Sequence, residues 1–507
     1  MGAVRPRLAR AAAAAGPRVA RLATTTKPQL TRATRTWQYT AGAATAGLAL
    51  AAGAVTAAGP WDSSGQRTAE RDRAAAWGAT GGADHGRGPA GREPGAAPSA
   101  ASVLTGLGAG TTVRAAPDAP DGRALDRVLE PFLKNPALGP RRSVSVVDLT
   151  TGKRLYGVGG GTPLTPASTT KIATAVAALS ALGPDHRLTT RTALEPDTGE
   201  LVLVGGGDPT LTARKKTGGH ASLRTLAART AAALTERGLR KITLSYDTTL
   251  YAGPELHPIG VNDNLAPVTP LMLDEARTDD STRGPAPRVP EPAADAARRF
   301  GDLLKDHGIK TTPPGPSRAT GRAEPVAAVS SPPLATLVER MLTNSDNDIA
   351  EALARHTAVA AGERADLAGA GDAVRARLDR LGLPVDGADI KDGSGLDRSG
   401  RLTADLLTAL LVTAADPGRP ALRPALTGLP VAGFTGTLTG RYEDGAAGFV
   451  RAKTGTLRGV NALAGTVVDR DGRVLAFAFM ASGTTDPGAA QEALDKAATA
   501  LASCGCG

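Results

Sequence analysis

Aromatic and sulfur-containing side chains are scarce in this chain. Only 3% of its 507 residues are Phe, Trp or Tyr, and only two are cysteine. Few aromatic rings leave little surface on which unpaired bases could stack, so the composition argues against a protein that binds single-stranded nucleic acid. The two cysteines, Cys504 and Cys506, stand too close together for a disulfide framework. A tight disulfide in an oxidising compartment and two free thiols are both left open.

Two common hydrolase patterns are also absent. The six histidines include no His-Glu-x-x-His pair, which argues against a zinc peptidase. No Gly-x-Ser-x-Gly segment occurs, which removes the usual nucleophile turn of α/β-hydrolases. The glycine run at residues 205–207 is not followed by Gly-Lys-Ser/Thr, so it does not predict a phosphate-binding loop. We expect neither a metal ion nor a cofactor.

Acidic side chains are missing from the first 60 residues. That segment holds eight Lys and Arg, whereas the whole chain has a net charge of +10, so the rest carries only +2 (10 − 8). The excess of positive charge therefore comes from the N-terminal segment and does not indicate a nucleic-acid partner. Because positive residues stay on the cytoplasmic side of a membrane, we expect residues 1–36 to be a basic cytoplasmic or signal-initiating segment and the remainder to be exported.

Residues 37–61 carry no charge, yet few of them are strongly apolar, so they form a weak candidate for a membrane span. Trp37, Tyr39 and Trp61 near its ends slightly favour an uncleaved anchor. The small residues Val55-Thr56-Ala57 instead suit a cleavage site. The sequence leaves open a signal anchor and a cleaved signal peptide.

Residues 62–122 are rich in Gly, Pro and Ala, with scattered charges and little periodicity. Such a composition buries too little apolar surface to fold, and it predicts a disordered linker.

Three short polar motifs follow one another along the rest of the chain. They are Ser168-Thr169-Thr170-Lys171, Ser345-Asp346-Asn347 and Lys453-Thr454-Gly455. A tripeptide alone is weak evidence, and a second Lys-Thr-Gly at residues 216–218 illustrates the risk. That second copy has no strand pattern around it and precedes the Ser-Asp-Asn motif, so we interpret it as a loop.

The first motif begins a predicted helix. Pro166 precedes it, and an alanine-rich run continues to Gly183, which suits a helix end. Ser168 and Lys171 are three residues apart and share a face of that helix. The pattern places an amine within reach of a hydroxyl at the positive end of the helix dipole.

The other two motifs also have a recognisable local setting. Residues 334–358 show helical spacing of apolar side chains, interrupted by the three polar residues at 345–347. Residues 448–452 are strand-like and lead into Lys453. Residues 460–468 and 474–480 then predict a hairpin around Asp469-Arg470-Asp471-Gly472.

Together the motifs resemble the active-site set of low-molecular-mass class C penicillin-binding proteins, the family of D-alanyl-D-alanine carboxypeptidases and endopeptidases. The segments Pro166–Lys171, Ser345–Glu351 and Ala452–Leu457 are similar to the family's three motifs. Lys391–Arg398 is similar to its Asp-Gly-Ser-Gly-Leu segment. The resemblance runs from about Arg123 to the C-terminus.

The resemblance implies an α+β protein with the penicillin-binding and serine β-lactamase-like fold. It has an antiparallel five-stranded sheet flanked by helices, beside an all-helical lobe. The catalytic domain would comprise residues 123–188 and 325–507. Ser345 stands 177 positions after Ser168 (345 − 168), a much longer interval than in class A β-lactamases, so we expect residues 189–324 to form a smaller inserted α/β accessory domain. The deacylating Glu-x-x-Leu-Asn element of those β-lactamases is absent, which argues against efficient β-lactam hydrolysis.

The resemblance also implies roles for the site residues. Ser168 would attack the peptide carbonyl, and Lys171, deprotonated through burial and the neighbouring Lys453 cation, would accept its proton. Ser345 would relay that proton to the leaving amine, while Asn347 would orient Lys171. Lys453 would face the substrate carboxylate, with help from Thr454, Gly455 and Thr456 in substrate and oxyanion binding.

The implied substrates are peptidoglycan stem peptides ending in D-Ala-D-Ala, with β-lactam antibiotics as inhibitors. The implied location is the extracytoplasmic face of the cell membrane or the cell wall outside it. Two alternatives remain: a β-lactamase-like serine hydrolase, and a noncatalytic protein that binds the cell wall.

Overall fold

The structure is a computed structural model in which residues 122–442 and 445–505 are described. The predicted N-terminal segments 1–36 and 37–61, and all but the last residue of the predicted linker 62–122, lie outside these residues. Within the described part, none of the helices combines the length and apolarity needed to cross a bilayer. Cys504 is disulfide-bonded, and the only other cysteine in the sequence, Cys506, lies outside the described residues.

An antiparallel sheet of five strands forms the centre of the catalytic part, in the order β2-β1-β11-β10-β9. The strands run from both ends of the described chain: β1 Arg141–Asp148, β2 Arg154–Val158, β9 Val450–Leu457, β10 Val460–Val468 and β11 Val474–Ser482. The predicted hairpin is present, since β10 pairs with β11 from Val460↔Ser482 to Val468↔Val474. The predicted fold class is confirmed. β9 lies at one edge of the sheet, where Val431 forms an isolated antiparallel bridge with Arg451 near the start of the strand.

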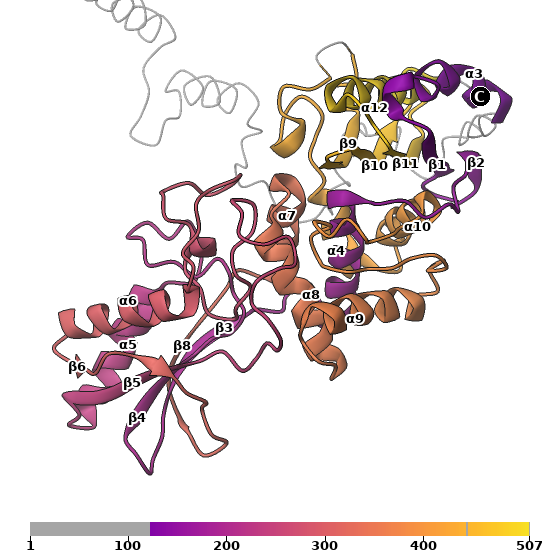
Figure 1. Cartoon of the computed structure of the whole chain (residues 1–507). Helices are drawn as coiled ribbons and strands as arrows, with labels where there is room; N and C mark the ends of the chain where they lie inside the picture. The colour runs from indigo at the N-terminus through magenta and orange to yellow at the C-terminus, as the bar shows by residue number, and fades with distance from the viewer. Residues whose placement is uncertain (1–121, 443–444, 506–507) are drawn as a thin grey trace, which may run out of the picture. The chain divides into compact units, whose positions relative to one another are not determined.

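Helices cover both faces of this sheet (Figure 1). The terminal helices α3 Gly122–Leu133 and α12 Pro487–Ala502 pack together on one face, while α10 Ala404–Ala415 lies on the other. With both faces covered, β11 is apolar along nearly its whole length and is buried on both sides rather than in alternation. Its rings Phe477 and Phe479 join the core beneath α12.

A helical lobe packs beside the sheet. Its members are α4 Thr170–Leu182, α7 Leu334–Asn344, α8 Asn347–Ala361 and α9 Leu367–Arg380. α4 contacts α7, α8, α9 and α10, and ten of its residues in succession, from Thr170 to Leu179, are buried. A helix enclosed on all sides must be apolar or small-chained around its whole circumference, which explains its alanine-rich sequence. The charged Lys171 is the exception.

The inserted segment forms a second sheet of its own, in the order β6-β5-β4-β3-β8 with β7 beside β5. Its strands are β3 Thr189–Leu194, β4 Glu200–Val204, β5 Lys241–Asp247, β6 Lys310–Thr311, β7 Gly315–Pro316 and β8 Glu324–Ser330. Two helices, α5 Leu223–Glu236 and α6 Pro292–Asp306, pack against this sheet to give a separate core. β8 pairs with β3, so the inserted fold reaches Ser330, beyond the expected boundary at residue 324.

The longest connection in the insert runs from residue 248 to residue 291, between β5 and α6. It contains only the short 3₁₀ turn Asp274–Ala276 and returns to the catalytic part through contacts with α8 and with the loop after α9. Connections this long without regular structure are uncommon in compact domains and usually serve a function.

The packing of α3 against α12 and the sheet should contribute measurably to stability. Leu129 lies in that core with none of its surface exposed. Replacing Leu129 by Ala should lower the free energy of unfolding by about 2–5 kcal/mol, because the lost methyl groups leave a cavity. Chemical denaturation of the catalytic part would measure the change.

The matched control is Val158→Ala, since Val158 is 49% exposed at the end of β2. Its effect should stay within about 0.5 kcal/mol. Equal effects of the two substitutions would contradict the packing described above.

Candidate active site

Ser168 lies in a 3₁₀ turn, Ala167–Thr169, that leads directly into α4. Ala167 adopts a left-handed backbone with φ of +48°, which is uncommon for a residue with a side chain. Neighbouring backbone packs closely against this turn, at two positions where only glycine fits. A Cβ atom added to Gly395 would lie 1.9 Å from the Ala167 carbonyl oxygen, and one added to Gly455 would lie 2.7 Å from the Pro166 carbonyl oxygen. The hydroxyl is thus presented from a tightly enclosed bend.

Lys171 stands in the first turn of α4 and is fully buried. Its Nζ atom lies 3.0 Å from Ser168 Oγ, 2.7 Å from Asn347 Oδ1 and 2.7 Å from the backbone carbonyl oxygen of Ser394. The predicted contact between the amine and the hydroxyl is present. Three partners fix the direction of the amine, so one of its hydrogens or its lone pair must point at Ser168.

The second motif occupies the junction of two helices. α7 ends at Asn344, Ser345 takes a left-handed conformation with φ of +58°, and Asp346 caps α8 by accepting from the Ile349 N–H. Asn347 then begins α8, and its Nδ2 donates to the Asn264 carbonyl oxygen over 2.8 Å. Because an amide group donates from one end and accepts at the other, this contact turns Asn347 Oδ1 toward Lys171.

The third motif lies on the edge strand β9. Lys453 is fully buried, and its Nζ donates to the Thr454 carbonyl oxygen over 2.9 Å. Within residues 122–442 and 445–505, no carboxylate pairs with this lysine. Thr454 Oγ1 donates to Thr437 Oγ1 over 3.1 Å. Gly455 permits β9 to lie against the turn of Ser168, as the close approach to Pro166 shows.

A cavity of about 320 Å³ opens over these motifs. Ser168, Ser345, Asn347 and Thr456 line it from the catalytic part, and the inserted connection supplies the opposite wall with Asn264, Arg277, Arg283 and Arg288. Ser345 therefore borders the site, although its hydroxyl has no hydrogen-bond partner in the described part of the chain. The second Lys-Thr-Gly, at 216–218, lines a different cavity.

Burial controls the charge of the two lysines. It lowers the pKa of Lys171 to about 8, against the opposing pull of the Asp392 and Glu351 carboxylates. The pKa of Lys453 is also lowered well below that of an ordinary lysine, first by burial and then by the charge of Lys171. We expected burial and the Lys453 cation together to lower the pKa of Lys171. Burial is the cause of the lowering at Lys171, whereas the repulsion between the two lysines lowers the pKa of Lys453.

Two groups that hold Lys171 in place were not predicted: the backbone carbonyl of Ser394 and, through Asn347, that of Asn264. The sequence identified the segment around Ser394 only through its similarity to the family's Asp-Gly-Ser-Gly-Leu segment. Backbone acceptors leave no mark in a sequence, because every residue carries one.

A cluster of carboxylates lies behind the second motif. Glu275, Asp346 and Asp348 approach closely enough to suggest a metal site. Arginines already occupy that region, since Glu275 pairs with Arg277 and Arg340 and Asp348 pairs with Arg288 over 2.9 Å. The cluster is therefore an ion-pair network that fixes the start of α8.

Comparison with known proteins gives a consistent result. The D-Ala-D-Ala carboxypeptidase 3 (S13) family matches residues 125–287 and 277–503. Carboxypeptidase DacB of Mycolicibacterium smegmatis is 39% identical over 407 residues, covering 76% of this chain and 86% of the relative. A D-alanyl-D-alanine carboxypeptidase of an Actinomadura species is 31% identical over 444 residues, covering 71% of this chain and 81% of the relative.

Among solved structures, penicillin binding protein 4 of Haemophilus influenzae shares the fold with a TM-score of 0.57 at 22% identity, over 72% of this chain and 93% of that one. The antiparallel sheet, the helical lobe and the Ser-Lys pair between them define a serine hydrolase of the penicillin-binding class.

The chain belongs to the D-Ala-D-Ala carboxypeptidase 3 (S13) family and is a low-molecular-mass class C penicillin-binding protein, as the resemblance predicted. It is a serine-type carboxypeptidase.

The lowered pKa of Lys171 predicts how acylation depends on pH. A base must be neutral, and a pKa of about 8 leaves roughly a tenth of Lys171 neutral at pH 7, whereas an ordinary lysine would be neutral in well under about 0.1% of molecules. The rate of acylation by a labelled penicillin should therefore rise with pH and level off above about pH 8. Stopped-flow or quenched measurements from about pH 6 to pH 10 would test this. A rate still rising tenfold per pH unit at the upper end would contradict it.

Proposed function

We propose that this carboxypeptidase removes the terminal D-alanine from peptidoglycan stem peptides by way of an acyl-enzyme on Ser168. The observation that carries the proposal is the buried Lys171 amine between Ser168 Oγ and Asn347 Oδ1. A serine hydroxyl needs a neighbouring base to attack a carbonyl, and Lys171 is the only such group in contact with it within the described residues.

In the first step the Ser168 oxygen bonds to the carbonyl carbon between the two D-alanines, and its proton passes to Lys171. The negative charge on the carbonyl oxygen is stabilised by the backbone N–H groups of Ser168 and Thr456, an assignment that follows from the family resemblance. Donors of this kind typically contribute about a hundredfold or more in rate. The carbon–nitrogen bond then breaks, and the proton travels through Ser345 to the departing amine.

In the second step a water molecule hydrolyses the ester on Ser168 and restores the hydroxyl. A β-lactam amide resembles the scissile dipeptide and acylates the same oxygen. Its leaving amine stays joined to the acyl group by the rest of the opened ring system, whereas D-alanine diffuses away. Slow hydrolysis of that ester produces inhibition, which agrees with the absence of a Glu-x-x-Leu-Asn element.

The C-terminal carboxylate of the substrate is assigned to Lys453. This lysine is buried and lacks a carboxylate partner within the described residues, so an incoming anion would restore its charge. The Thr454 and Thr456 side chains stand on the same edge strand and would add hydrogen bonds. The preference for a free C-terminus follows from this arrangement.

We place the catalytic part outside the cytoplasmic membrane, where its substrate is found. The uncharged segment 37–61, preceded by eight basic residues, supports export, either as an anchor or as a cleaved signal.

Substitution of the nucleophile tests the proposal directly. Incubated with a labelled penicillin, the wild-type protein should gain one acyl group by intact mass, and Ser168→Ala should gain none because no other hydroxyl of the described residues hydrogen-bonds to Lys171. Ser399→Ala, an exposed serine, is the control. Undiminished labelling of Ser168→Ala would refute the assignment, and rapid turnover of penicillin would favour a β-lactamase.

The role of Lys453 predicts a change in substrate preference. The wild-type protein should cleave a peptide ending in free D-Ala-D-Ala far better than the corresponding C-terminal amide. In Lys453→Met this preference should fall by about tenfold or more, because a buried charge pair is lost. Steady-state kcat/KM values for both peptides would measure it, with the exposed Lys241→Met as control. An unchanged preference would show that another group receives the carboxylate.

A further inference from the structure

The inserted connection between β5 and α6 contacts two parts of the catalytic machinery. Its Asn264 carbonyl orients Asn347, as described above. Further along the surface of α8, its Ala266 N–H donates to Asp348 Oδ1 over 2.9 Å. A third contact, from His257, reaches the loop after α9 that carries Ser394. The family resemblance predicted none of these contacts, because it treated the insert as a separate accessory domain.

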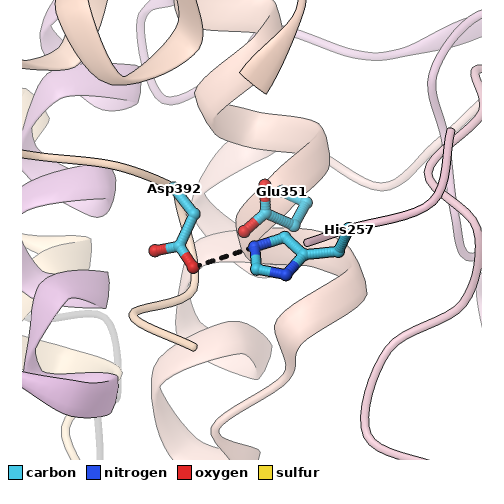
Figure 2. Close-up of side chains that lie close together, drawn as sticks. All are labelled: His257, Glu351 and Asp392. Atoms are coloured by element: carbon cyan, nitrogen blue, oxygen red, sulfur yellow. Dashed lines mark hydrogen bonds and ion pairs between the residues drawn. The ribbon is translucent and has the colours of Figure 1, made fainter. Parts of the chain in front are cut away.

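His257 is enclosed between the insert and the catalytic part, with 2% of its side chain exposed. Its Nε2 lies 3.1 Å from Asp392 Oδ2, and its Nδ1 accepts a hydrogen bond from the Ile259 N–H over 3.3 Å. An imidazole nitrogen that accepts carries no proton, so the proton of the neutral ring is on Nε2 and is donated to Asp392. Figure 2 shows the ring directed at Asp392, with Glu351 beside it.

Asp392 in turn shapes the loop that supports Lys171. Its Oδ1 accepts from the Gly395 N–H and its Oδ2 from the Asp397 N–H, both over 2.7 Å. These bonds close a tight turn around Ser394. On the other side of the turn, the Ser394 N–H donates to Glu351 Oε1 over 2.9 Å, and its carbonyl oxygen accepts from Lys171 Nζ. The direction of that carbonyl therefore depends on Asp392 and Glu351 together.

The same three side chains, His257, Glu351 and Asp392, are close enough to suggest a metal site. Their existing bonds oppose that interpretation. Glu351 Oε2 accepts from Arg355 over 3.0 Å, Oε1 is bound to Ser394 N–H, and both nitrogens of His257 are engaged. A cation would have to displace a buried guanidinium and break the loop, so the cluster is a hydrogen-bond network.

We propose that His257 is a positioning residue of the catalytic site: it holds Asp392, Asp392 sets the turn of Ser394, and the Ser394 carbonyl orients the Lys171 amine toward Ser168. The inserted domain therefore contributes directly to the geometry of the active site. This inference rests on the proposed role of Lys171 as the base.

Two substitutions that differ by one methylene group separate the contacts of His257. In His257→Gln the amide can reach Asp392 as Nε2 does. In His257→Asn the amide of the shorter side chain extends only as far as Nδ1 of the histidine. The hydrogen bond from the Ile259 N–H is therefore kept, and the hydrogen bond to Asp392 is lost. Saturation kinetics with a labelled penicillin resolve the affinity of the first complex from the limiting rate of acylation of Ser168.

We expect His257→Asn to lower the limiting acylation rate about tenfold or more, with the affinity of the first complex changed by less than about twofold, because a displaced Lys171 impairs proton transfer and not binding. His257→Gln should stay within about threefold of wild type in both quantities. His307→Asn, an exposed histidine at the end of α6 in the same inserted domain, is the control and should behave as wild type.

Three outcomes would overturn the inference: an unchanged acylation rate in His257→Asn, equal losses in the Asn and Gln variants, or failure of His257→Asn to fold while His257→Gln acylates normally. Circular dichroism and the thermal midpoint identify the last case, which would make His257 structural. A wild-type protein that is not acylated at Ser168 would instead refute the proposed function itself, so the two failures are distinguishable.

Discussion

The burial of one lysine amine is the constraint on which the site depends. The Lys171 amine is removed from water and lies between Ser168, Asn347 and the Ser394 carbonyl. Burial favours the neutral amine, which can accept a proton, and these three contacts limit the directions in which its lone pair can point. Helix α4 must be enclosed by α7, α8, α9 and α10 for this to happen, so the helical lobe serves the chemistry as well as stability.

A second consequence is that several carboxylates and cations lie close together around the site, so that each depends on neighbouring groups of opposite charge. The carboxylates of Asp392 and Glu351 oppose the loss of the Lys171 proton, while burial promotes it. Behind the second motif, burial raises the pKa of Asp348 to about 6, and the Arg288 guanidinium from the insert opposes that rise. The insert thus supplies both cations and neutral donors to a site that lies on the other part of the fold.

Much of the fold followed from the sequence. The helix at α4 and the hairpin of β10 and β11 were visible as apolar segments with turn residues at their ends. The length of the second sheet was less accessible, because β8 is largely exposed and pairs with β3 far back in the chain, and local pattern carries no information on such pairing.

The sequence by itself identified the side chains to which the proposed chemistry is assigned. Ser168 and Lys171 lie three apart on one helix, so their contact needs only local structure. The tertiary structure alone decided how Asn347 and Lys453 approach them, what lowers the pKa of Lys171, and that Asn264, His257 and Ser394 hold the arrangement. Those contacts join segments at least 83 residues apart, and several use backbone carbonyls that every residue possesses. Burial is a property of the packed whole, and so is the charge of a buried lysine.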